Sequence, residues 1–393
     1  MRATRLAIAL FFFGDGLMIG SWAGRIPAVQ HHAGLTTARL GLALFAASLG
    51  ALVAMPAAGR LCERVGSRSI TLAGLLLGGG SLFAASLSTG LAGLSAALFA
   101  FGVGFGAINV AANAQGVALE RVAGRSILSS FHAMFSAGGL VGAGTAAVVA
   151  AADIGVQLHY AALAIVLTMF GLAGVSYLLP PEADDRVEEK ARRSAFARPP
   201  RAIVVLGAAA FCTMLAEGAA VDWSAVYLSR SFGAAAGVAA LAYTAFAFMM
   251  MTSRAVGDRL NRRLGPVTLA RTGGAVATLG LGLALVIGSV PVAIAGFAAM
   301  GAGLGVVIPV LFRAAASTQA VSASVGLATV STIGWFGFLA GPPAIGFAAS
   351  AFGLRAALGI VVLATLTLVA LAGNAEPGRR RQPAAAGRLR TDS

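Results

Sequence analysis

Charged residues are scarce in this sequence: Asp, Glu, Lys and Arg make up 11% of its 393 residues, whereas apolar residues make up 58%. A soluble domain usually carries about 25% charged residues. The mean hydropathy of +0.88 is correspondingly high. These values exclude an ordinary soluble domain, and we expect neither a soluble catalytic core nor an enzyme.

Cysteine is almost absent as well. The two cysteines, Cys62 and Cys212, fall in a polar loop and in an apolar run. Two cysteines so placed provide neither a disulfide framework nor the ligand spacing of a metal site. We therefore expect no metal and no cofactor.

What the chain does contain is a succession of apolar runs, each about 20 residues long and able to cross a hydrocarbon core of roughly 30 Å. We expect twelve transmembrane helices in an all-α membrane protein. The twelve predicted spans are residues 6–28, 38–58, 70–88, 91–116, 126–150, 157–179, 202–229, 236–256, 267–288, 290–313, 323–350 and 352–373.

A polar, proline-flanked segment interrupts these spans once and divides them into six and six. Such a segment is typical of a solvated linker between two membrane bundles. The expected organisation has four parts. They are an N-terminal bundle at 1–180, a cytoplasmic linker at 181–201, a C-terminal bundle at 202–373 and a disordered basic cytoplasmic tail at 374–393.

The net charge of +14 would suggest nucleic-acid binding in a soluble protein. Its distribution indicates membrane topology instead, because 24 of the 28 basic residues fall at the N-terminus, in or near alternate loops, or in the tail. Excess Lys and Arg mark cytoplasmic loops. We expect both termini on the cytoplasmic side of the cytoplasmic membrane and no nucleic-acid partner. The tail arginines are expected in solvent, with contact to anionic membrane lipids as the alternative.

The two halves resemble one another at a shift of 199 positions. This shift places Arg60, Leu61, Arg64 and Gly66 on identical residues after the eighth span. It also superimposes glycines of span four on span ten, and of span five on span eleven. Parallel halves of this kind are typical of transporters that hold their substrate between two bundles near the midplane.

Residues 59–68 read GRLCERVGSR. This loop resembles the signature of the major facilitator superfamily, G-x-L-x-D-R-x-G-R-R, with Glu63 in place of Asp and Ser67 in place of Arg. The resemblance implies two six-helix bundles, a monomer and a role in gating for the charged residues of this loop and of its counterpart. A loop that merely sets topology is the alternative. The implied gate residues are Glu63, Arg64, Arg68, Asp258, Arg259 and Arg263.

More narrowly, residues 104–114 (GFGAINVAANA), 129–132 (SSFH) and 135–139 (FSAGG) resemble the branch that contains fucose:proton symporters and related permeases. This resemblance implies uptake of a sugar-like solute together with protons. The sequence departs from the branch at Asn109, which lies near the position of a functional acid on span four.

Three acidic residues fall inside predicted spans, namely Asp15, Glu217 and Asp222. An ionisable group at membrane depth is costly and marks a functional site by default. Asp15 and Glu217 lie at similar depth in equivalent spans, and we expect them to exchange protons. A structural carboxyl bonded to a neighbouring helix is the alternative. Asp222 is expected to pair with Arg25 of the opposite bundle as an external gate.

Polar and aromatic side chains inside the spans are candidates for contact with the solute. Amide, imidazole and indole groups can hold a polar substrate, but they also join and pack helices. The candidates are Asn109, Asn113, His132, Trp22, Trp223 and Trp335.

Together these features predict a secondary active transporter that works by alternating access. Its substrate would be a small solute such as a sugar or polar metabolite, carried with protons. Proton-driven efflux of a lipophilic drug or secondary metabolite is the alternative.

Overall fold

The computed structural model describes residues 1–124, 127–180, 199–318 and 321–375. Most of the expected linker and of the expected tail lies outside these ranges. In the described part of the first half, six long helices are connected by short loops. These are α1 (Arg2–His32), α2 (Thr37–Val65), α3 (Ser67–Leu87), α4 (Gly90–Ala123), α5 (Leu128–Ala151) and α6 (Val156–Val175).

The second half is also entirely helical in the described residues. Its elements are α8 (Arg201–Phe232), α9 (Ala236–Leu264), α10 (Pro266–Ile287), α11 (Val290–Leu304), α12 (Val307–Ser317), α13 (Ala323–Ala357), α14 (Gly359–Leu371) and the short 3-10 turn η3 (Ala372–Ala375). Within the described ranges, eleven helical segments are long and apolar enough to cross a membrane, with α11 and α12 counted as one, and α14 is a shorter apolar helix. The predicted all-α membrane fold is confirmed.

Two of the predicted spans bend or break. Span ten divides into α11 and α12, because Pro309 has no N–H to offer the carbonyl of Gly305 four residues earlier. At the start of the predicted span 352–373, Gly353 adopts φ 80° and ψ 157°, a conformation that favours glycine. The last crossing therefore begins after Gly353, although the helix assignment of α13 continues to Ala357.

The helix boundaries repeat the shift of 199 seen in the sequence. α2 ends at Val65 and α9 at Leu264, and both are followed by a glycine with positive φ, 85° at Gly66 and 77° at Gly265. The close contacts repeat too. A Cβ on Gly102 would overlap the carbonyl oxygen of Ala47, and one on Gly301 would overlap that of Phe246. The repeat thus extends to the packing of α4 on α2 and of α11 on α9.

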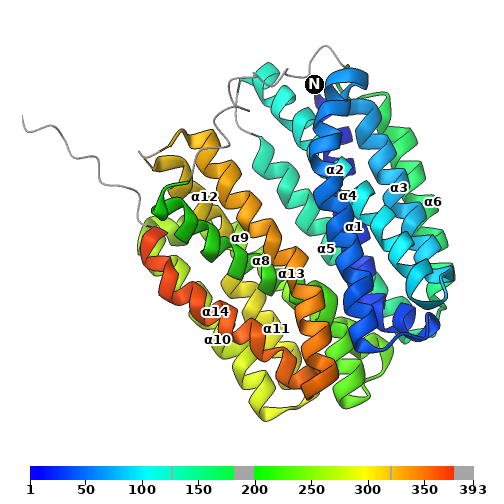
Figure 1. The fold of residues 1–393 in the computed structure, drawn as a ribbon. Helices are drawn as coiled ribbons and strands as arrows, with labels where there is room; N and C mark the ends of the chain where they lie inside the picture. The colour runs from blue at the N-terminus through cyan, green and yellow to red at the C-terminus, as the bar shows by residue number, and fades with distance from the viewer. Residues whose placement is uncertain (125–126, 181–198, 319–320, 376–393) are drawn as a thin grey trace, which may run out of the picture.

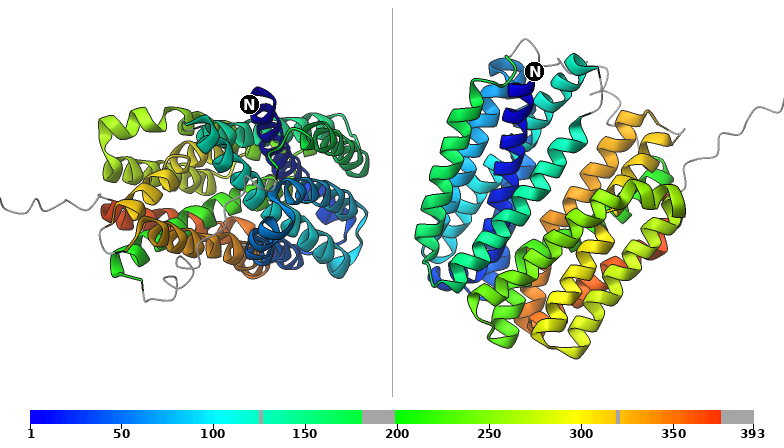
Figure 2. Two further views of the ribbon diagram at one scale, coloured as in Figure 1. Left: turned by 90° about the horizontal axis from the view of Figure 1, so that it is seen from above. Right: turned by 180° about the vertical axis from the view of Figure 1, so that it is seen from behind.

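Helices α1–α6 and α8–α14 form two bundles, which meet mainly where α5 packs on α9 and α2 packs on α13 (Figure 1). We name this meeting surface the bundle boundary. The bundles diverge toward the end of the molecule that carries the N-terminus, in both Figure 1 and the right-hand view of Figure 2. We name this the diverging end, and the opposite one the closed end.

Small residues bring the bundles together at the closed end. A Cβ on Gly41 of α2 would lie 2.7 Å from the carbonyl oxygen of Pro342 in α13. On the other side of the boundary, a Cβ on Gly237 of α9 would lie 2.7 Å from the Cβ of Ala151 in α5. Such close backbone approach is typical of membrane helix packing. The closed end is therefore sealed by direct helix contact on both sides.

Candidate functional site

Asp15 lies deep within the N-terminal bundle. The glycines on either side of it leave room for neighbours, since a Cβ on Gly16 would overlap the carbonyl oxygen of Phe135 in α5. This close packing leaves the side chain of Asp15 only 3% exposed, and its Oδ1 atom has no hydrogen-bond partner. A buried carboxyl without a partner costs free energy, which makes a functional role the default hypothesis.

Glu217 of α8 lies beside an arginine of the same bundle. Its Oε2 atom is 3.8 Å from Nη2 of Arg254 in α9, while its Oε1 atom is buried without a partner. The two side chains differ in access, with Glu217 14% exposed and Arg254 35% exposed. In this ion pair the carboxylate is therefore the more buried partner and the guanidinium the more accessible one.

Arg254 is not among the candidates named from the sequence, because basic residues in or near alternate loops indicate membrane topology. It lies about 15 Å before the end of α9 at 1.5 Å per residue. A helical side chain leans toward the N-terminus of its helix, so this arginine extends back toward the middle of the membrane. Its position two residues inside the predicted span 236–256 was the available signal.

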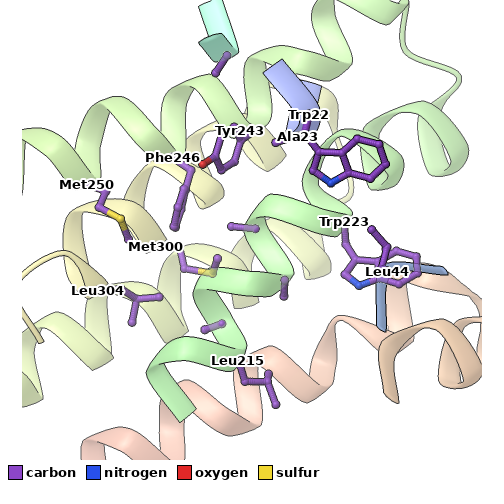
Figure 3. Packing of buried hydrophobic residues seen from close by; sticks show 14 of the residues in the cluster. Trp22, Ala23, Leu44, Leu215, Trp223, Tyr243, Phe246, Met250, Met300 and Leu304 are labelled. Atoms are coloured by element: carbon purple, nitrogen blue, oxygen red, sulfur yellow. The ribbon is translucent and has the colours of Figure 1, made fainter. Parts of the chain in front are cut away.

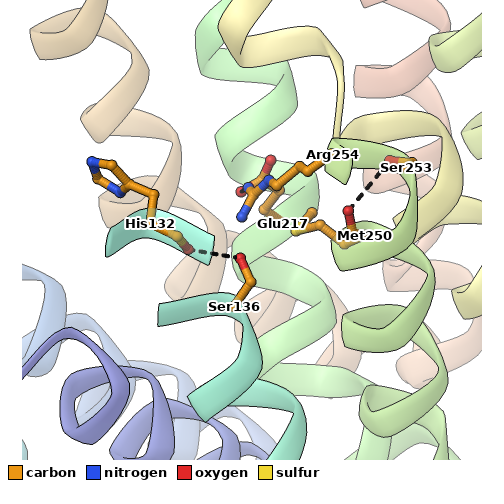
Figure 4. A network of polar contacts seen from close by, with 6 residues as sticks. All are labelled: His132, Ser136, Glu217, Met250, Ser253 and Arg254. Atoms are coloured by element: carbon orange, nitrogen blue, oxygen red, sulfur yellow. Dashed lines mark hydrogen bonds and ion pairs between the residues drawn. The ribbon is translucent and has the colours of Figure 1, made fainter. Parts of the chain in front are cut away.

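His132 and Ser136 of α5 approach this pair from the other bundle (Figure 4). The hydroxyl of Ser136 donates to the carbonyl oxygen of His132 at 3.2 Å, and His132 is exposed. Arg254 is close enough to act electrostatically on His132. Polar groups from α5, α8 and α9 thus gather at the bundle boundary, toward the diverging end.

The two asparagines of α4 differ in what their side chains do. The Nδ2 atom of Asn113 donates to the backbone oxygen of Asn109 at 2.6 Å, within the same helix. Asn109 is half-buried, and the described residues include no partner for its side-chain amide. Of the two, Asn109 has the side chain more readily available to a solute.

The tryptophans named as candidates lie in packed surroundings. Trp22 and Trp223 are 2% and 0% exposed and belong to the buried cluster near the contact of α1 with α8 (Figure 3). Trp335 of α13 is half-buried and its ring centroid lies 5.3 Å from that of Phe338. In this conformation Trp22 and Trp223 are packed inside the protein, and a role in solute contact stays a prediction for all three.

The predicted gate residues at the diverging end lie on or near the surface. Glu63 and Arg64 are exposed at the end of α2, and Arg68 is half-buried near the start of α3. Their gating role stays a prediction.

In the equivalent loop of the second half, Asp258 accepts a hydrogen bond from Nη1 of Arg313 at 2.9 Å, which joins α9 to α12 within one bundle. Arg259 and Arg263 are exposed. Gating by this loop also stays a prediction.

The predicted external pair is not formed in this conformation. Nη2 of Arg25 donates to the carbonyl oxygen of Ile154 at 2.6 Å, in the loop between α5 and α6. Asp222 is half-buried on α8, and the described residues contain no ion pair between it and Arg25. The guanidinium therefore holds its own bundle together at the closed end.

The chain matches known transporters over almost all of its length. Residues 6–328 match the sequence model of the Major Facilitator Superfamily. An uncharacterised transporter of this type from Yersinia pestis is 35% identical over 94% of each chain. A membrane protein, MosC, from Rhizobium meliloti is 33% identical over 94% of this chain and 89% of that protein.

Two kinds of solved structure share the fold at low sequence identity. A D-xylose-proton symporter gives a TM-score of 0.71 at 14% identity, covering 93% of this chain and 96% of the other. The nucleoside transporter NupG gives 0.75 at 12% identity, covering 95% and 98%. At these identities the likeness establishes the fold alone.

Proposed function

The chain belongs to the Major Facilitator Superfamily, and from this premise we propose that it is a secondary transporter that moves a small polar solute together with protons. The family establishes a multi-pass membrane transporter of a small solute, not an enzyme. The proposal adds proton coupling, a polar solute, a cytoplasmic-membrane location with both termini inside, and a monomeric state.

The observation that carries the proposal is the gathering of polar groups at the bundle boundary. Glu217 and Arg254 of one bundle approach His132 and Ser136 of the other. Ionisable side chains at membrane depth are costly unless they face a protein interior or an aqueous pathway. Because Arg254 and His132 are accessible, the boundary at the diverging end is the natural pathway for a polar solute.

The closed end supports alternating access. There the Nε and Nη1 atoms of Arg25, the Nε1 atom of Trp223 and the hydroxyl of Tyr227 are buried without partners. Each such group costs about 1–3 kcal/mol when it stays unsatisfied. A second conformation that opens this end would hydrate them. With the predicted topology, the present conformation faces the cytoplasm and the second would face outward.

Proton coupling is supported by the two carboxyl groups at mid-depth. Neither Asp15 Oδ1 nor Glu217 Oε1 has a hydrogen-bond partner. Burial favours the neutral form of a carboxyl, so a carboxyl that meets water in alternate conformations can carry a proton across. The D-xylose-proton symporter and the nucleoside transporter show that this fold accommodates polar solutes. Membership of the fucose:proton symporter branch stays a prediction.

Efflux of a lipophilic compound is the second candidate. A groove of about 610 Å³ lies between α1, α5 and α6, and apart from Tyr177 all of its lining residues lack polar side chains. None of the polar groups of the boundary lines it, and its walls include residues such as Leu10, Phe13 and Phe170. A groove of this kind suits an apolar compound that arrives from the lipid.

Transport by the purified protein in liposomes separates the two candidates. With an inward proton gradient, we expect accumulation of a polar solute from a panel that includes D-xylose, uridine and sugar acids. A protonophore should abolish it. Equal uptake with and without the gradient would contradict proton coupling. Gradient-driven movement of ethidium or rhodamine 6G, with no polar solute carried, would favour efflux instead.

A further inference from the structure

The ion pair of Glu217 with Arg254 leaves most of the arginine's binding capacity unused. A guanidinium carries five N–H donors. In the part of the chain that the structure describes, its ion pair is a single contact of 3.8 Å, longer than the roughly 2.7–2.9 Å of a charge-assisted hydrogen bond. At 35% exposure the group is reachable from the boundary. Arg254 therefore has donors available for a ligand.

The arginine faces the boundary and not the lipid. It pairs with α8 of its own bundle and acts electrostatically on His132 of the other bundle. The titratable groups nearest to it are Glu217 of α8, Tyr243 on its own helix and His132 of α5. Among these neighbours Arg254 supplies the one permanent positive charge, since arginine stays protonated in proteins.

We propose that Arg254 binds the carboxylate of a small hydroxylated acid at the bundle boundary, where the solute replaces Glu217 as the counterion of the arginine. This inference rests on the proposed transport function and names its substrate class. A planar guanidinium matches a carboxylate through two parallel hydrogen bonds. The hydroxyl groups of such a solute would meet Ser136, His132 and Asn109 on the opposite bundle.

The charges favour this class over the other two. A cationic solute would place a second positive charge beside Arg254. A phosphate ester carries up to two negative charges, for which one arginine is insufficient. A neutral sugar would leave the guanidinium and its partner as they are and would gain no charge-assisted hydrogen bond. A single carboxylate matches a single available arginine.

Proton uptake accompanies this binding. Once the solute occupies Arg254, an ionised Glu217 would lie beside a second negative charge without a counterion. Glu217 therefore takes up one proton as the anion binds, and the proton and the anion travel together. By reciprocity, acidification strengthens binding of the anion.

Three hexopyranoses of the same size and different charge test the inference, namely D-glucuronate, D-glucose and D-glucosamine. Binding to the purified protein is measured by isothermal titration calorimetry. We expect D-glucuronate to bind at least about tenfold more tightly than the other two, because charge-assisted hydrogen bonds are stronger than neutral ones. The affinity for D-glucuronate should increase as the pH is lowered from about 8 to 5.5. The sugar acid stays ionised over this whole range.

Four variants identify the residues. Arg254→Gln should weaken D-glucuronate binding about 10- to 100-fold and leave D-glucose unchanged, while Arg254→Lys should give an intermediate loss. Glu217→Gln should keep the binding but remove its pH dependence. Arg262→Gln is the matched control, an exposed arginine two turns further along α9. Size-exclusion profiles and thermal midpoints verify folding.

Any one of four results would overturn the inference. These are equal affinity for the three sugars, tighter binding of D-glucosamine, no binding of D-glucuronate, or unchanged D-glucuronate binding in Arg254→Gln. The proposed transport function fails separately. If a proton gradient drives uptake of a neutral solute, the function stands and the carboxylate site is wrong. If D-glucuronate binds through Arg254 but no gradient drives its uptake, the site stands and the coupled function is wrong.

Discussion

The two halves hold their mid-membrane carboxyl groups in different surroundings. Asp15 is 3% exposed, flanked by glycines and without a charged partner in the described residues. Glu217 is 14% exposed and lies 3.8 Å from Arg254. One acid is sealed inside its bundle, and the other belongs to an ion pair that reaches the bundle boundary.

The way α1 packs on α5 and α8 packs on α13 shows a second difference between the two acids. A Cβ on Gly138 of α5 would overlap the carbonyl oxygen of Phe13, and one on Gly337 of α13 would overlap that of Phe211. The shift between these partners is 211 − 13 = 198 positions, which places Asp15 opposite residue 15 + 198 = 213. That residue is Thr213, whose hydroxyl donates to the carbonyl oxygen of Ala209 at 2.9 Å. Glu217 thus lies one helical turn from the true counterpart of Asp15.

The difference separates what the repeat keeps from what it changes. Close helix contacts recur because each bundle must pack the same backbone geometry, and any added atom there meets a carbonyl. Charged residues inside the membrane have no such constraint, since a working transporter needs each one in a single place. The two halves therefore share their packing and the arginines that follow spans two and eight, whereas Asp15, Glu217 and Arg254 have no charged counterpart at the shift of 199.

The largest expected effect tests the shared packing. Gly102→Val and Gly301→Val should each destabilise the protein by about 3 kcal/mol or more, because the new side chain overlaps the backbone of Ala47 or Phe246. Fluorescence-detected size exclusion and thermal unfolding in detergent provide the measurement. Gly80→Val is the control, since a Cβ on Gly80 meets nothing within 4 Å. If one of the two variants were as stable as the wild type and the other unfolded, the two halves would not share this packing.

The next effect tests the divided chemistry. Asp15→Asn and Glu217→Gln should both lose proton-driven accumulation, which for one proton and a gradient of two pH units falls from a limit of about 100-fold to about one. Their stabilities should change in opposite directions. An amide in place of the unpartnered Asp15 should raise the thermal midpoint, whereas Glu217→Gln leaves Arg254 without its counterion and should lower it.

Paired measurements of liposome uptake and thermal unfolding check both variants. If the thermal midpoints of Asp15→Asn and Glu217→Gln moved in the same direction, the two carboxyl groups would contribute to stability in the same way. Full accumulation by Asp15→Asn would remove Asp15 from the proton pathway.

The architecture could be predicted from the sequence, whereas the contacts of the site could not. Apolar runs and the 199-residue repeat predicted the helices, because length and hydropathy decide membrane insertion. The partner of Arg25, the role of Arg254 and the burial of Trp223 depend on how helices rotate against each other. A helix that is apolar on all sides gives no sequence signal for which face points toward its neighbours. The break before Pro309 was readable from the proline itself.

The smallest effect concerns a hydrogen bond that only one side of the boundary can form. The hydroxyl of Ser48 in α2 donates to the carbonyl oxygen of Phe338 in α13 at 3.1 Å. At the shift of 199 the counterpart of Ser48 is Ala247 in α9, which has no hydroxyl. Ser48→Ala should therefore weaken the closed end by about 0.6–1 kcal/mol and raise the population open there roughly three- to fivefold.

Electron–electron double resonance between spin labels at residues 152 and 231, in a background with Cys62 and Cys212 replaced, measures the opening of the closed end. Ser350→Ala is the control, because the hydroxyl of Ser350 donates to the carbonyl oxygen of Phe347 within its own helix. An unchanged distance distribution in Ser48→Ala would mean that helix packing alone seals this end. The two sides of the boundary would then be equivalent in energy despite the difference in sequence.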